Sequence, residues 1–187
     1  MSGAIAATLR DAVTRRASFL VMAVPRLAGK TTVMRAMLGE LPRSAPVRAI
    51  GVDGDDIDVL LAESAGGYFV IPEIAEGPWA PGYIRGAPVR RIFRGVGTDA
   101  SLATALHAPD PESAFAIICG PNRVPDEDAA KLSLVVYLRS LGPDWRVPRR
   151  RVVATVHRIE GVEGGRPRAR LLHRWNERAD RFEDVGA

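Results

Sequence analysis

The chain has 187 residues, enough to bury a core of its own, and its one cysteine, Cys119, excludes an internal disulfide. The longest apolar run near the start, residues 19–24, has the length of a strand and falls far short of a membrane span, and no leader pattern precedes it. The formal net charge is +4, but the arginines are dispersed and aromatic residues are few, which argues against a nucleic-acid partner. We expect one cytoplasmic domain over residues 1–187.

Patterns of helix and strand alternate through the first half of the chain. Apolar residues four apart predict an amphipathic helix over residues 4–17, and the continuous apolar run at 18–24 is typical of a strand buried on both faces. A helical pattern follows at 31–41 and ends at Pro42. Further strands are expected at residues 47–52, 68–71 and 101–106, and further helices at 55–64 and 111–118.

The middle of the chain has weaker signals. Residues 77–98 are rich in proline, glycine and arginine, which predicts irregular or short helical structure, and residues 119–127 predict a loop. Residues 129–141 are ambiguous, because the acidic run before them favours a helix start while residues 132–138 fit a strand.

The last forty residues or so predict an antiparallel hairpin at the edge of the sheet. An alternating pattern at 151–159 is followed by a glycine-rich turn at 161–166 and a second strand at 169–175. Strands that alternate with helices and then end in a hairpin predict an α/β fold with a mainly parallel central sheet and a C-terminal antiparallel hairpin.

The segment from Val24 to Thr32 follows the first buried strand and opens a helix, and it contains Gly-Lys-Thr-Thr. In this context the motif predicts a phosphate-binding loop (P-loop), because N–H groups at a helix start point at phosphates. Lys30 would neutralise phosphate oxygens, and the Thr31 hydroxyl would bind Mg²⁺. Val24 stands where such loops usually begin with glycine, and the alternative is an ordinary strand-to-helix turn. The residues expected to bind the nucleotide are Pro25, Arg26, Leu27, Ala28, Gly29, Lys30, Thr31 and Thr32.

Three polar residues follow other predicted strands. Glu73 and Asp53 come after apolar runs, and acids at the carboxyl ends of parallel strands are placed to orient a water or help hold Mg²⁺. The alternative for each is a helix cap or a solvated loop acid. His107 ends the strand predicted at 101–106 and could sense a terminal phosphate, although a lone histidine there is usually structural.

Several segments, in chain order, resemble the secretion and pilus motor ATPases of type II and type IV systems. Pro25 with the Gly-Lys-Thr-Thr of residues 29–32 resembles that family's Walker A motif, and residues 70–73 resemble its Walker B strand, with Pro72 in place of the usual glycine. Residues 101–108 are similar to its histidine box. The later segments at 134–138, 149–153 and 160–165 are similar to its C-terminal strands.

The resemblance implies a RecA-like fold, hydrolysis of ATP with Mg²⁺, and a hexameric ring in contact with a membrane complex. Lys30 and Thr31 would carry phosphate and Mg²⁺, Glu73 the Walker B role and His107 the histidine-box role, and Asp53 falls at the family's acidic box. Residues 18–127 would be the nucleotide-binding core and residues 128–187 the C-terminal strands. The family's N-terminal domain has no counterpart in residues 1–17, so a separate protein that supplies it is the alternative to a minimal form.

Two functions from other classes stay open. One is a nucleotide-dependent interaction protein with little hydrolysis, and the other is a basic regulator that binds nucleic acid. The arginines at 85, 90, 91 and 94 would reach a neighbouring subunit's nucleotide, or they form a solvated basic face. The sequence does not decide whether ATP is hydrolysed.

Overall fold

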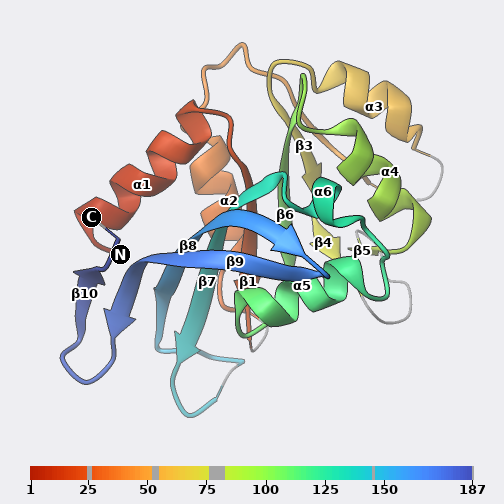
Figure 1. The fold of residues 1–187 in the computed structure, drawn as a ribbon. Coiled ribbons are helices and arrows are strands. Elements are labelled where there is room, and N and C mark those ends of the chain that lie inside the picture. Colours follow the sequence, from red (N-terminus) through yellow and green to blue (C-terminus); the bar gives the residue numbers. More distant parts are fainter. Residues whose placement is uncertain (25–26, 52–54, 76–82, 145, 187) are drawn as a thin grey trace.

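The structure is a computed structural model that describes residues 1–24, 27–51, 55–75, 83–144 and 146–186. Within these ranges an eight-stranded sheet crosses the molecule in the order β10-β9-β8-β7-β1-β6-β3-β2 (Figure 1). Its strands are β1 (Ser18–Ala23), β2 (Val47–Ala49), β3 (Tyr68–Ile71), β6 (Ser101–Leu106), β7 (Leu132–Leu141), β8 (Arg150–Glu163), β9 (Arg166–Asn176) and β10 (Arg181–Asp184). A separate parallel pair consists of β4 (Glu73–Ile74) and β5 (Tyr83–Ile84).

Five neighbouring strands of the sheet, β7, β1, β6, β3 and β2, run parallel. The central strand β1 pairs with β6 on one side and with β7 on the other, and β3 pairs with the far side of β6. The carboxyl ends of β1, β6 and β3 therefore meet at one edge of the sheet, and loops at this edge are the usual place for ligands in such folds. This confirms the predicted α/β fold with a mainly parallel central sheet.

The C-terminal part adds antiparallel strands to the edge of the parallel sheet. Strands β7, β8, β9 and β10 pair antiparallel in succession, so the expected hairpin is part of a larger antiparallel unit. The turn expected at 161–166 is shorter, because β8 continues to Glu163 and only Gly164 and Gly165 make the turn. Strand β10, which the sequence analysis did not predict, is short and charged and pairs with the exposed edge of β9.

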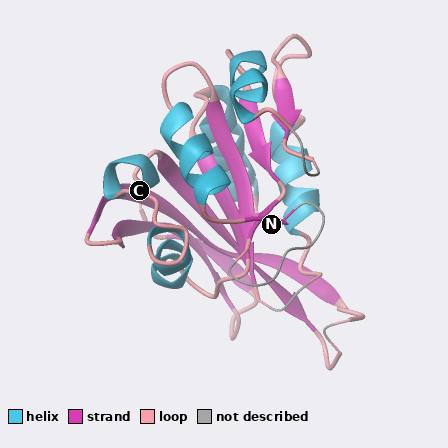
Figure 2. Cartoon of the chain, turned by 90° about the vertical axis from the view of Figure 1, so that its right-hand side faces the viewer, coloured by secondary structure: helices cyan, strands magenta, loops and turns pink. Residues whose placement is uncertain are grey.

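Helices cover both faces of the sheet (Figures 1 and 2). The helices are α1 (Gly3–Thr14), α2 (Lys30–Leu38), α3 (Ile57–Glu63), α4 (Ala87–Gly95), α5 (Pro111–Cys119) and α6 (Asp126–Ala129). Buried residues of α1 and α2 pack with Phe19 and Val21 of β1, while those of α3 to α6 pack with Leu20 and Met22. Successive residues of a strand point to opposite faces, so the uninterrupted apolar run of β1 fills two cores.

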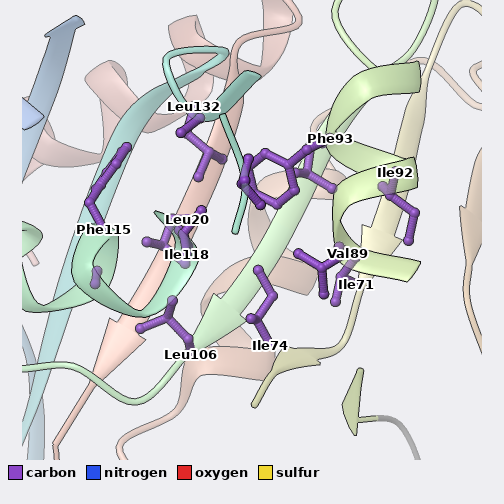
Figure 3. Close-up of a cluster of buried hydrophobic side chains, with 14 of the residues drawn as sticks. Leu20, Ile71, Ile74, Val89, Ile92, Phe93, Leu106, Phe115, Ile118 and Leu132 are labelled. Carbon is purple, nitrogen blue, oxygen red and sulfur yellow. The ribbon is translucent and has the colours of Figure 1, made fainter. Parts of the chain in front are cut away.

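Figure 3 shows side chains of the core that α4 and α5 cover, where Val89 of α4 lies beside Ile71 at the end of β3. This packing fixes the position of the segment that leads into Glu73. The nine-residue α4 lies inside the segment predicted as irregular or short helical, and α6 begins within the predicted loop at 119–127. No helix within the described ranges is long and apolar enough to cross a membrane.

Candidate anion-binding site

The segment that joins β1 to α2 contains the predicted phosphate loop, of which the structure describes residues 27–32 (hereafter the 27–32 loop). Pro25 and Arg26, both predicted to contact the nucleotide, lie outside the described residues. The angle φ is positive at Leu27 (64°) and Gly29 (95°) but not at Ala28 between them. Backbone that alternates in this way turns successive N–H groups toward one point and forms a concave anion site.

Gly29 is the residue immediately before α2, and it has no side chain to accept hydrogen bonds from the first turn. The N–H groups at the start of a helix lack partners within the helix and carry the positive end of its dipole. In α1, α3 and α5 the side chain of Ser2, Asp56 or Asp110 accepts a hydrogen bond at the corresponding position. The start of α2 differs from these helices in that it has no side-chain cap and its residues line a cavity together with the 27–32 loop.

Three predicted site residues come together at the carboxyl edge of the parallel strands. Lys30 Nζ lies 3.4 Å from Glu73 Oε2 and 3.0 Å from His107 Nε2. His107 Nε2 also lies 2.9 Å from Glu73 Oε1. The side chains of Lys30 and Glu73 are only 10% and 13% exposed, so water screens their attraction much less than it would at the surface.

His107 is placed to donate or accept at this cluster, depending on one proton. Its Nδ1 lies 3.0 Å from the carbonyl oxygen of Ala23 and 3.2 Å from Lys30 Nζ, so this nitrogen donates to the carbonyl or accepts from the ammonium, depending on the tautomer. A proton on Nε2 is donated to Glu73, whereas a bare Nε2 accepts from the ammonium of Lys30. The ring therefore links the end of β1 to both charged partners.

The charge of Glu73 is favoured by its surroundings. Burial raises the pKa of its carboxyl. The hydrogen bond from His107 and the charge of Lys30 together lower the pKa by more than burial raises it, so the pKa lies below its usual value. Glu73 is therefore a carboxylate at neutral pH, with both of its oxygens engaged.

A cavity of about 700 Å³ lies over this cluster. Its lining includes Thr31 and Thr32, which are exposed in the first turn of α2, and so brings the predicted hydroxyl ligand near the predicted phosphate position. The full lining is Leu27, Ala28, Gly29, Lys30, Thr31, Thr32, Val33, Glu73, Tyr83, His107 and Arg151.

Tyr83 and Arg151 are cavity residues that the sequence analysis did not select. Tyr83 is brought beside Glu73 by the pairing of β5 with β4. Arg151 comes from β8, and its Nε donates to the carbonyl oxygen of Leu27 over 2.8 Å. The run of three arginines at 149–151 was visible in the sequence, but only the strand alternation decides which of them faces the loop.

Other predicted residues are not part of the described site. Asp53, predicted as a metal ligand, lies outside the described residues. In the arginine segment, Arg91 pairs with Asp58 and Arg90 donates to the carbonyl oxygen of Asn122, away from the cavity. Within the described ranges, no three histidine, cysteine, aspartate or glutamate side chains gather to hold a metal ion.

The fold is similar to that of the VirB11 ATPase from the type IV secretion system of Brucella suis, a structure determined in complex with sulphate. The TM-score is 0.56 and the identity 19%, over 82% of this chain and 52% of the VirB11 chain. This chain thus spans about half the length of that neighbour. No protein-family model and no curated protein sequence matches the chain. At this identity the likeness concerns the fold, and the roles of individual residues stay predictions.

Replacing Lys30 by methionine tests whether its charge holds the Glu73 carboxylate. Lys30→Met keeps the length of the side chain but removes the charge, so the opposing effect of burial should raise the pKa of Glu73. The measurement is a carboxyl NMR titration of Glu73 in both proteins. Arg35→Met, an exposed change on the same helix, is the control and should leave the titration unchanged.

The lowered pKa of Glu73 in the wild type predicts how the stability depends on pH. A carboxyl whose pKa is depressed in the folded state stabilises it above the ordinary value of 4.5, and this stabilisation is lost as pH falls through the folded-state pKa. The wild type should therefore lose stability relative to Lys30→Met as the pH falls from about 4.5 through the folded-state pKa. An identical Glu73 titration in both proteins would contradict the assigned ion pair.

Proposed function

We propose that this chain is a nucleotide-binding module that binds ATP, with the phosphates at the 27–32 loop, and that the chain hydrolyses the bound ATP. The observation that carries the proposal is the meeting of Lys30, Glu73 and His107 beneath a loop of alternating backbone conformation. They come from the segments that follow three neighbouring parallel strands, β1, β3 and β6, where a cavity of about 700 Å³ is open to a ligand.

The binding chemistry follows from the charges at this edge. The start of α2, which has no side-chain cap, contributes the positive end of the helix dipole, and Lys30 adds a full charge there. An anion with several oxygens can contact the start of α2 and the ammonium of Lys30 at the same time. The similarity in fold to an ATPase that was determined with sulphate supports this choice of ligand, since sulphate is also a tetrahedral anion.

Magnesium fits the site through the Thr31 hydroxyl, which is exposed and lines the cavity. The ion would neutralise charge that develops on the phosphates. Asp53 remains a predicted ligand from outside the described residues. Because Glu73 already has partners for both oxygens, we assign it to the water rather than to direct binding of the ion.

Hydrolysis requires an exchange of partners at Lys30. When the ammonium moves to a phosphate, it gives up its ion pair with Glu73 and leaves one carboxylate oxygen available. A carboxylate at that position can orient an attacking water and accept its proton. His107, which contacts both residues, keeps the carboxylate in place during the exchange.

A binding protein with little hydrolysis is the second candidate. The specific observation in its favour is that both oxygens of Glu73 are engaged by Lys30 and His107. If Lys30 and His107 both keep their contacts with Glu73 after nucleotide binding, neither carboxylate oxygen becomes available to act on water. The chain then acts as a nucleotide-dependent interaction protein.

For assembly we propose a ring of several copies, a hexamer by resemblance, that works with a secretion or pilus membrane complex. The support is the fold likeness to an ATPase of a type IV secretion system. Because the likeness covers about half of the VirB11 chain, a separate protein that completes the nucleotide site is the alternative.

Removing the charge of Lys30 should weaken nucleotide binding. A hydrogen bond to a charged group contributes enough that Lys30→Ala should raise the Kd for MgATP about tenfold to a hundredfold. Isothermal titration calorimetry measures this directly. Arg35→Ala also removes one positive charge from α2, but its side chain lies outside the cavity lining, and it should bind like the wild type. Equal affinities in all three proteins would rule out the proposed site.

Glu73→Gln separates hydrolysis from binding. The amide keeps the shape but cannot accept a proton from water, so turnover should fall by about a hundredfold or more while MgATP still binds. Phosphate release under single-turnover conditions is the measurement. A wild type that binds MgATP but releases no phosphate faster than Glu73→Gln would favour the second candidate.

A further inference from the structure

Arg151 lies against the 27–32 loop from the opposite side to Glu73 and His107. In the sheet, β8 and β7 lie on one flank of β1, while β6 and β3 lie on the other. Arg151 Nε donates to the carbonyl oxygen of Leu27, and its Cδ lies 3.4 Å from where a Cβ on Gly29 would be. The guanidinium is thus brought to the loop by the antiparallel part of the sheet.

The charge of Arg151 is not neutralised by any carboxylate in the described part of the chain. Its neighbour Arg150 points to the other face of β8, where it pairs with Asp180 at 2.7 Å and lies over the ring of Trp175. Among the described residues, the bond to Leu27 is the one hydrogen bond that the side chain of Arg151 makes, so its two terminal nitrogens keep their donors. These donors lie on a side chain that lines the cavity.

The cavity lining as described is therefore positive. It contains two cations, Lys30 and Arg151, and one carboxylate, Glu73, which Lys30 and His107 already neutralise. The start of α2, at Lys30, adds further positive potential. A planar guanidinium with free donors suits the several oxygens of a phosphate better than a single acceptor.

We propose that Arg151 is a second phosphate-binding residue of this site, one that binds a polyphosphate through its terminal nitrogens while its Nε holds the loop. This inference rests on the proposed function and adds to it a second cation that binds the phosphates. Lys30 lies beside Glu73 and His107, whereas Arg151 contacts the loop at the carbonyl oxygen of Leu27, and both line the same cavity. Two cations in one cavity suit a chain of two or more phosphates, which nucleoside di- and triphosphates supply.

Two substitutions of Arg151 separate binding of the ligand from support of the loop. Arg151→Gln removes the charge, and Arg151→Lys keeps a charge but has no Nε to donate to Leu27. Calorimetry with MgATP should show affinity about tenfold to a hundredfold weaker for Arg151→Gln, and at least partly restored in Arg151→Lys. Arg150→Gln, which removes the adjacent charge from the other face, is the matched control and should bind like the wild type.

A second probe checks the class of ligand. Inorganic phosphate should bind weakly, and its affinity should differ less between wild type and Arg151→Gln than that of MgATP. Thermal unfolding of each variant confirms that the proteins compared are folded.

The outcomes distinguish a failure of the role proposed for Arg151 from a failure of the proposed nucleotide binding. If the wild type binds MgATP and Arg151→Gln binds it equally well, the inference is wrong and the nucleotide site stands. If Arg151→Lys is as weak as Arg151→Gln, Arg151 supports the loop and does not bind the ligand, which also overturns the inference. If the wild type binds no MgATP while all variants are folded, the proposed function fails and this inference fails with it.

Discussion

The partly buried ion pair between Lys30 and Glu73 is the interaction on which this account depends. Its two side chains are 10% and 13% exposed, so neither charge is well solvated, and each stabilises the other. The pair exists because β1 and β3 run parallel on either side of β6 and end at the same edge of the sheet. A shift of one residue in either pairing would send the side chains of a strand to the opposite faces.

In this arrangement Lys30 can exchange its partner Glu73 for an anionic ligand. Burying two charges costs free energy that their attraction only partly returns, so the pair alone is weak evidence for a stabilising role. The pair is better explained as a way to keep the ammonium of Lys30 in position at the start of α2 until a phosphate binds. The carboxylate it leaves behind is then the group with the right charge and place to act on water.

The antiparallel strands take part in the site instead of only closing the edge of the sheet. Arg151 of β8 donates a hydrogen bond to the carbonyl oxygen of Leu27. Leu27 has a positive φ, a conformation that costs a residue other than glycine about 1–2 kcal/mol. The bond helps to keep the loop in a conformation that its sequence does not favour. The two halves of the sheet are thus joined at the loop that we propose binds phosphate.

Much of the parallel core could be predicted because its signals are local. The strands at 68–71 and 101–106 have the predicted bounds, since a strand buried on both faces is a continuous apolar run between loop residues. Glu73 and His107 could then be selected because they follow such runs, and the family resemblance supported the same residues. What each of them does in a reaction remains a prediction.

The parts that could not be predicted depend on contacts between distant segments. Arg151 is one of three consecutive arginines, and nothing in the sequence distinguishes it from Arg150 until the register of β8 sets them on opposite faces. Strand β10 is charged and lacks a continuous apolar run, and it forms because β9 offers it an edge, where Glu183 pairs with Arg174. The turn between β8 and β9 is shorter than predicted, because Gly161 continues the strand through an irregular pairing.

The central claim is that the backbone N–H groups of the 27–32 loop receive the phosphates of a nucleotide. A titration of ¹⁵N-labelled protein with MgATP, followed by two-dimensional NMR, tests it most directly because each amide is observed separately. The account predicts that the largest shift changes occur at the amides of residues 28–32 and saturate with the ligand. Resonances of these amides that stay in place at saturating MgATP, or changes confined to other segments, would contradict it.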